Sequence, residues 1–150
     1  MITFNQQFDS RSDISNLLGG DLVKGIATAE KTDSILLFTN ENEIYTDYFY
    51  PKGTYKYCMY TGIGRYGHQD SLENSMYNLN ISVMTHKKDN RPLLLFEKRQ
   101  RLYFFLGEYE LLETHQNLQP DHNNKIRRVF VFHLKQVNTC LLYTSDAADE

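Results

Sequence analysis

Residues 60–70 read Tyr-Thr-Gly-Ile-Gly-Arg-Tyr-Gly-His-Gln-Asp, and their types and spacing point more directly to a binding site than any other stretch. Glycine permits positive φ and lets a backbone approach a ligand closely. The stretch follows a Tyr-rich, strand-like segment and precedes a helix-like one. It is therefore either a ligand-binding loop or a plain strand-to-helix turn. The residues that we single out in this loop are Gly62, Gly64, Arg65, Gly67, His68 and Gln69.

The glycines also match the spacing of the GxGxxG dinucleotide fingerprint. That fingerprint needs a parallel βαβ unit and an acidic residue about 20 positions further on, at the end of the second strand. Here the glycines follow several expected strands, and the strand after the helix begins at Pro92. The pattern therefore does not favour a dinucleotide site.

Metal and nuclease motifs are weak in this sequence. The histidines at 68, 86, 115, 122 and 133 form no HxxxH or HxH pair, and Cys58 and Cys140 lack the paired spacing of a zinc site. Pro120-Asp121 could open a PD-(D/E)xK nuclease signature, but no D/E-x-K follows before the C-terminal segment. A self-contained Mg²⁺-dependent nuclease using Asp121, Glu97 and a nearby lysine stays open as an alternative.

The elements around the glycine loop predict an α+β domain. Residues 9–20 have polar caps, an apolar stripe and a Gly-Gly end, which indicates a short N-terminal helix. Residues 71–86 repeat apolar side chains at helical spacing over about four turns. Strands are expected at 34–39, 44–50, 54–60, 92–97, 102–106 (bulged at Gly107 and continuing to 113) and 126–134, with a loop over 116–125. Five to six strands with one long helix favour a curved, partly closed β-barrel, which hides sheet edges.

Composition limits the class of protein. The 150-residue length suits one domain. No apolar run approaches the roughly 18 residues of a membrane span. The N-terminus lacks the basic and apolar regions of a signal peptide, so we expect a cytoplasmic protein without membrane contact.

The last eleven residues, 140–150, read Cys-Leu-Leu-Tyr-Thr-Ser-Asp-Ala-Ala-Asp-Glu and resemble the translation of a transposase-type sequencing-library adapter. We therefore expect the natural domain to occupy 1–139 and the natural chain to continue beyond Thr139. Within 1–139, the first 85 residues are net acidic and the rest net basic. The basic half is either a nucleic-acid face or a set of solvated strand edges.

The order of motifs resembles that of a known family. Tyr60-Thr61-Gly62-x-Gly64, followed by Gly67 and Asp70, is similar to the Tyr-Thr-Gly-x-Gly segment of SRA (SET- and RING-associated) domains, in particular the SRA-like domains of ScoMcrA-type HNH restriction endonucleases. Further stretches fit in order from about residue 10 to 135, among them Gly25-Ile26-Ala27, Leu95-Phe96-Glu97 and Gln119-Pro120-Asp121. The resemblance implies a PUA-type curved β-barrel.

The resemblance also implies a function. SRA domains read modified cytosine, commonly by flipping the base into an aromatic pocket. Tyr60 stands at the pocket-tyrosine position, and the upstream candidates are Tyr45, Tyr48 and Asp47, whose carboxylate can accept from the cytosine amino group. Barrel packing is the alternative role for the tyrosines, and turn capping for Asp47. Ile63 and Arg65 replace the Glu-Gln that many relatives carry.

We therefore expect a binding module for double-stranded DNA with a modified base, belonging to an HNH endonuclease whose nuclease domain is not in this chain. The fragment itself is not expected to be catalytic or to need a cofactor; a divalent metal belongs to the nuclease domain. A PUA-like reader of RNA or phosphorothioate DNA is a further alternative. Expected phosphate contacts, besides Arg65, are Lys87, Lys88, Arg99, Arg101, Arg127 and Arg128.

Overall fold

The computed structural model describes residues 1–40 and 47–141, which hold two helices and ten strands. The helices are α1 (Arg11–Leu18) and α2 (Tyr77–Met84). The strands are β1 (Ile2–Thr3), β2 (Gln7–Phe8), β3 (Ile26–Ala29), β4 (Ser34–Asn40), β5 (Tyr48–Tyr50), β6 (Tyr57–Thr61), β7 (Leu93–Arg99), β8 (Leu102–Pro120), β9 (Ile126–Asn138) and β10 (Cys140–Leu141).

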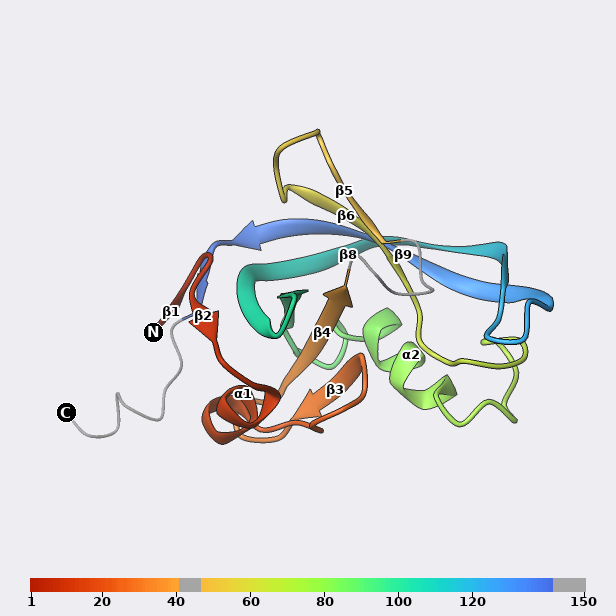
Figure 1. The fold of residues 1–150 in the computed structure, drawn as a ribbon, viewed down its shortest axis with the longest axis horizontal. Coiled ribbons are helices and arrows are strands. Elements are labelled where there is room, and N and C mark those ends of the chain that lie inside the picture. Colours follow the sequence, from red (N-terminus) through yellow and green to blue (C-terminus); the bar gives the residue numbers. More distant parts are fainter. Residues whose placement is uncertain (41–46, 142–150) are drawn as a thin grey trace.

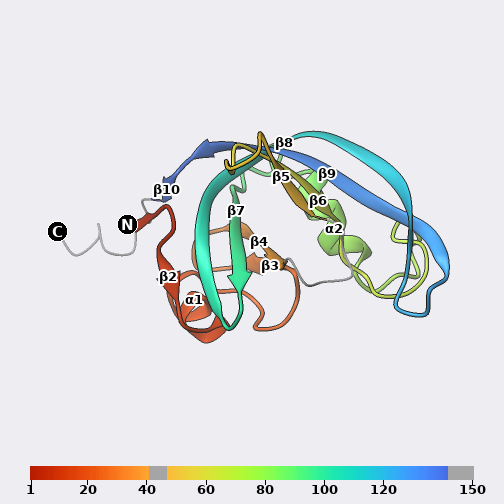
Figure 2. The same cartoon turned by 45° about the horizontal axis from the view of Figure 1, so that its top comes forward.

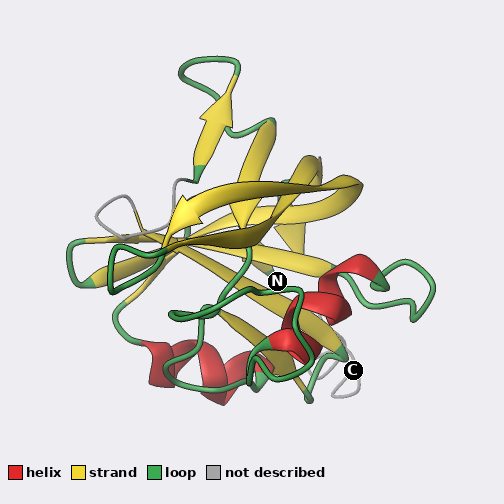
Figure 3. Cartoon of the chain, turned by 90° about the vertical axis from the view of Figure 1, so that its right-hand side faces the viewer, coloured by secondary structure: helices red, strands yellow, loops and turns green. Residues whose placement is uncertain are grey.

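One sheet organises the molecule, in the strand order β3-β4-β7-β8-β9-β6-β5, with β2 added to β8. The β4–β7 pair is parallel and the other pairs are antiparallel. A separate two-stranded sheet joins β1 to β10 near the N-terminus. Both helices lie on the same side of the long strands (Figures 1 and 3).

The hairpin of β8 and β9 is the longest feature and arches over the molecule (Figure 2). Its pairing shifts register between Leu111 and Glu113, and the β7–β8 pairing shifts opposite Gly107. Gly107 has φ 119°, a conformation that glycine adopts readily, so the predicted bulge at this residue is confirmed. Such bulges bend a strand and increase its twist, which accounts for the arch.

The expected barrel of five to six strands is not confirmed. The strand path begins at β3 and ends at β5, and no pairing among the described residues closes it. The sheet has eight strands because β2 and β3 were not expected. In addition, β8 continues to Pro120, through half of the region expected as a loop. Cross-strand pairing with β9 holds these polar residues in extended form, although their composition favours a loop.

Two apolar cores lie on the two faces of β4 and β7. Alternate residues of β7 point to opposite faces: Leu93 and Leu95 enter the core that also holds Tyr60, whereas Leu94 and Phe96 enter the core beneath α1. Burial on both faces explains why these two strands read as continuous apolar runs.

The helices match the sequence unequally. The predicted N-terminal helix is confirmed, and Ser10 caps it by accepting from the Asp13 N–H. The long helix expected at 71–86 begins only at Tyr77. Ser71 and Asn74 instead accept hydrogen bonds from the backbone of Glu73 and Met76, and such local bonds compete with helix formation. Neither helix has the length and apolar character needed to cross a bilayer.

Candidate functional site

A cavity of about 670 Å³ opens where β4, β5 and β6 end beside the glycine loop. Its wall combines aromatic rings, the carboxylates of Asp47 and Glu73, and several cations. The residues that the argument uses are Arg11, Lys24, Phe38, Thr39, Asp47, Tyr60, Thr61, Ile63, Arg65, Tyr66, Lys98 and Tyr103.

Tyr60 forms the floor of this cavity and is almost completely buried. Its hydroxyl lies 3.0 Å from the carbonyl oxygens of Gly25 and of Phe38. These contacts tie β6 to β4 and to the residue before β3, so the ring cannot swing out without breaking them. The expected pocket position of Tyr60 therefore coincides with a rigid part of the fold.

Asp47 supplies one of the two carboxylates of the cavity wall. Its Oδ1 accepts from the Thr61 backbone N–H at 2.7 Å, and its Oδ2 accepts from the Thr39 hydroxyl at 2.8 Å. These two bonds fix the position of the carboxylate in the wall.

Of the other two upstream candidates, Tyr48 lies away from this wall, and Tyr45 cannot be placed. Tyr48 does not line this cavity: it lies on the other face of β5, in a smaller cavity, with 55% of its surface exposed. The cause is the pleat of the strand, which sends Asp47 and Tyr48 to opposite sides. Tyr45 falls outside the described residues.

Two buried amides hold the start of the glycine loop. Asn80 on α2 accepts from the Ile63 N–H at 2.9 Å and donates to the Ile63 carbonyl at 2.8 Å. Gln69 donates to the Gly62 carbonyl at 2.7 Å and accepts from the Phe130 N–H at 2.8 Å. A Cβ at position 62 would lie 2.8 Å from oxygen atoms of both amides, so only glycine fits there. Gln69, expected as a DNA contact, is wholly buried and instead shapes the loop.

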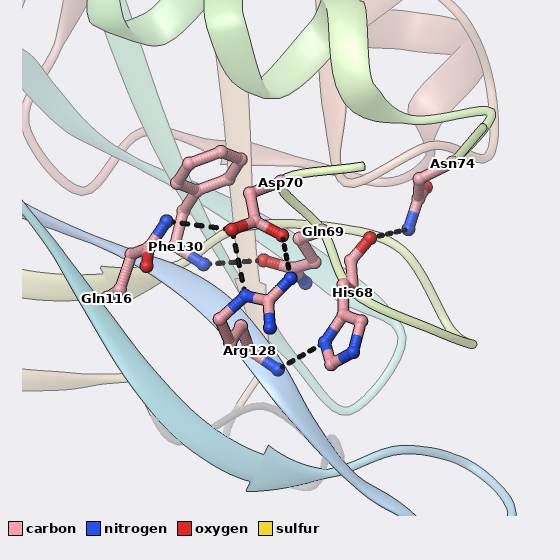
Figure 4. Close-up of polar contacts among 7 residues, drawn as sticks. All are labelled: His68, Gln69, Asp70, Asn74, Gln116, Arg128 and Phe130. Carbon is pink, nitrogen blue, oxygen red and sulfur yellow. Dashed lines mark hydrogen bonds and ion pairs between the residues drawn. The ribbon is translucent and has the colours of Figure 1, made fainter. Parts of the chain in front are cut away.

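The far end of the loop is fastened to the β8–β9 hairpin (Figure 4). Asp70 accepts from the Arg128 guanidinium at 2.9 and 3.2 Å and from the Gln116 amide at 3.0 Å. These bonds from Arg128 lower the pKa of the Asp70 carboxyl. The backbone N–H of Arg128 donates to Nδ1 of His68 at 3.0 Å. The loop therefore lies fixed between α2 and β9.

Arg127 and Asp121 also serve this junction. Arg127 is buried and donates to the Gly67 carbonyl at 2.8 Å. Asp121 accepts from the backbone N–H groups of Lys125 and Asn123, and these bonds lower its pKa. Arg127 therefore does not extend toward a phosphate, and Asp121 shapes the β8–β9 turn.

The remaining expected phosphate contacts lie away from the cavity wall. Lys87 pairs with Glu110 at 3.7 Å, and Arg99 pairs with Glu97 at 2.7 Å, while Lys88 and Arg101 are exposed. Of the predicted cations, Arg65 alone belongs to the wall, where it is exposed.

Sequence reasoning missed three cations of the wall, Arg11, Lys24 and Lys98. The Arg11 guanidinium lies 3.6 Å from the centre of the Phe38 ring and donates to the carbonyls of Asp21 and Lys24. Burial lowers its pKa from the usual value. No local motif marks it, because Arg11 reads simply as the first residue of a helix.

The described residues contain no group of three or more His, Cys, Asp or Glu side chains that could hold a metal ion. The two acids of the nuclease alternative are occupied in other ways. Asp121 caps a turn, and Glu97 accepts from Arg99 and from the Tyr55 hydroxyl.

Comparison with solved structures first defines the class of fold, that of SRA domains. The SUVH5 SRA domain, solved with methylated CHH DNA, matches with a TM-score of 0.65 at 14% identity over 95% of this chain and 93% of that one. The sulfur-binding and SRA domains of ScoMcrA, solved with phosphorothioated DNA, match at 0.70 and 20% identity, over 97% of this chain and 44% of that one.

The type IV phosphorothioation-dependent restriction endonuclease ScoMcrA matches with a TM-score of 0.71 at 22% identity, over 91% of this chain and 28% of that one. The chain thus spans less than half the length of the two ScoMcrA structures. The family model of the ScoMcrA-like SRA domain matches residues 4–146, and the chain belongs to this family. No curated protein matches the chain.

Proposed function

We propose that this chain is the reader of a modification-dependent HNH restriction endonuclease and binds double-stranded DNA that carries a modified cytosine. Membership of the ScoMcrA-like SRA family supports the class of ligand, as do the DNA complexes of its structural neighbours. The observation that carries the proposal is the Asp47 carboxylate. Thr39 and Thr61 fix it in a cavity whose floor is the Tyr60 ring.

The reading step that we propose is base flipping. Extruding a base costs a few kcal/mol of pairing and stacking, and burial of the base in a fitted pocket offsets that cost. The cytosine N4 amino group is a donor, and the Asp47 carboxylate is a matching acceptor. Tyr60 is one wall of the pocket. Because the Tyr60 hydroxyl contacts the Gly25 and Phe38 carbonyls, and Asp47 accepts from Thr39 and Thr61, little ordering of the pocket opposes binding.

The cations of the wall supply the sequence-independent part of the affinity. Lys24, Arg65 and Lys98 are charged groups beside the opening, and phosphate contacts of this kind position a duplex without reading its sequence. Removal of any one of these cations should lower the affinity for plain and modified duplexes about equally. It should also reduce the dependence of the affinity on salt concentration.

The test is fluorescence anisotropy of duplexes that differ only in one cytosine: plain, 5-methyl or 5-hydroxymethyl. We expect tighter binding to one modified duplex, and Asp47→Asn should weaken it by about tenfold or more, because a hydrogen bond to a charged group is worth about 1.5–3 kcal/mol. The matched control is Asp9→Asn, an exposed acid outside the cavity wall. Equal affinity for all three duplexes, unchanged in Asp47→Asn and Tyr60→Ala, would refute base-flipping recognition.

Two alternatives are tested in the same experiment. Competition by phosphorothioate DNA or by RNA, stronger than by the methylated duplex, favours a different ligand; the phosphorothioate arm matters because the ScoMcrA structure contains such DNA.

We also propose that cutting belongs to a nuclease domain elsewhere in the protein. Incubation of the 150-residue chain with Mg²⁺ and modified DNA should therefore give no cleavage.

A further inference from the structure

A second cavity, of about 280 Å³, lies on the other side of β5 and β6 from Tyr60. Its lining contains no Asp, Glu, Lys or Arg and consists of Tyr48, Met59, Thr61, His115, Gln116, Asn117, Gln119 and Val131. The cavity thus joins flat or apolar groups to amide, imidazole and hydroxyl groups, which is the mixture that a nucleobase can use.

One polar atom of this lining lacks a partner. Thr61 is 1% exposed, and its hydroxyl forms no hydrogen bond within the described residues. Buried hydroxyls are normally satisfied, so Thr61 marks a point at which the packing beneath this cavity leaves a polar atom without a partner. Its backbone N–H, in contrast, is used by Asp47 in the first cavity.

The strand register continues the cavity into a row of aromatic side chains. Tyr48 pairs with Met59, Tyr50 with Tyr57, and Met59 with His133, so the pleat places all five on the outer face. Ring centres are 6.3 Å apart for Tyr48–Tyr50 and 5.0 Å for Tyr50–Tyr57, and the latter two rings are nearly parallel at 15°.

His133 lies in the same row, 5.7 Å from the Tyr50 ring and hydrogen-bonded to its hydroxyl. The rings therefore form one continuous surface rather than separate exposed groups. Half-exposed aromatic rings in a row on a sheet are a platform on which successive bases can stack.

The charges around this row favour an anionic ligand. The Lys56 ammonium lies 5.6 Å from the Tyr57 ring centre, and Lys135 pairs with Tyr57 across the strands. Neither lysine forms an ion pair in the part of the chain that the structure describes. Of the two nearby acids, Glu110 lies 3.7 Å from the Lys87 ammonium, and Glu113 lies 3.4 Å from the His115 imidazole.

We propose that this outer face binds single-stranded nucleic acid. One unpaired base enters the second cavity beside Tyr48, where the amide side chains of the lining meet its polar edge. The next bases stack along Tyr50 and Tyr57, and the lysines contact the phosphates. A duplex does not fit, because its base faces are covered by stacking. The proposal does not depend on the base pocket, since Tyr48 does not line that cavity.

The test measures anisotropy of a labelled oligothymidylate with the 150-residue chain at low salt. Tyr48→Leu keeps apolar bulk but removes the ring, and should weaken binding by at least about fivefold, the lower end of what loss of one stacked aromatic causes. Tyr48→Phe keeps the ring and should bind like the parent. The control is Leu72→Ala, 81% exposed on another segment. Circular dichroism verifies the fold of each variant.

Two further arms separate the outcomes. Asp47→Asn should leave oligothymidylate binding unchanged while it weakens binding to the modified duplex, so the two sites can fail independently. The proposal is overturned if the oligothymidylate does not bind, if Tyr48→Leu and Tyr48→Phe behave alike, or if a plain duplex competes equally well. A concentration-dependent dimer that Tyr48→Leu abolishes would identify the face as a contact between copies, and would also overturn it.

Discussion

Replacement of Gln69 by alanine gives the sharpest test of how the glycine loop is held. The Gln69 side chain is wholly buried and bridges the Gly62 carbonyl and the Phe130 N–H at 2.7 and 2.8 Å. Alanine leaves both backbone groups unpaired in a dry environment, and each such loss costs about 1–3 kcal/mol. The free energy of unfolding should therefore fall by about 2–6 kcal/mol, a large part of the roughly 5–15 kcal/mol of a typical domain.

The assay is urea unfolding followed by circular dichroism at fixed protein concentration. The matched control is Gln116→Ala, which removes an exposed amide with one hydrogen bond to Asp70 and should cost less than about 1 kcal/mol. Gln69→Glu retains an acceptor for Phe130 but faces the Gly62 carbonyl with a second oxygen, so it should not rescue stability. A cost for Gln69→Ala no larger than that of the Gln116 control would refute the inference that this amide holds the loop.

His86 should make stability fall in mild acid. Its imidazole accepts from the Leu111 N–H at 3.1 Å and contacts the Arg91 carbonyl at 2.9 Å, and burial lowers its pKa. The contribution of neutral His86 to the free energy of unfolding is full above the unfolded-state pKa of about 6.5, and it is lost as pH falls below that value. His86→Gln should therefore flatten this part of a plot of stability against pH. The Asp70–Arg128 pair should show favourable coupling in a double-mutant cycle, and that coupling should shrink in high salt. For residues 140–150, sequencing of the source DNA should show adapter from codon 140; genomic sequence reading through that codon would refute the adapter hypothesis.

The sequence could predict the elements whose signal is local. The polar-capped helix within residues 9–20, the bulge at Gly107 and the apolar run of β4 each depend on residues close in the chain, and the structure confirms all three. The glycine loop was also located correctly between a strand and the segment that leads to α2.

The unpredicted parts depend on pairing and side-chain bonds that composition and periodicity do not reveal. The 116–120 region is a strand because β9 pairs with it, and the loss of helix at 71–76 follows from side chains bonding to the local backbone. Polar residues gave the least reliable expectations. Gln69 and Arg127 read as solvent-facing groups, yet burial against Gly62 and Gly67 makes them internal supports. Arg11 reads as an ordinary helix residue and lies in the cavity wall.

The parallel pairing of β4 with β7 has a consequence for how the chain folds. Ile35 pairs with Leu93, although β5, β6 and α2 all lie between them in sequence. This central pair cannot form by local hairpin closure. A long loop must close, with its loss of entropy, before the contacts between β4 and β7 stabilise the chain. Mixed folds dominated by such distant pairs fold more slowly than helical ones, and their apolar strands stay exposed for longer. We therefore expect refolding from urea to be slow and sensitive to protein concentration, with β4 and β7 as the segments at risk of aggregation.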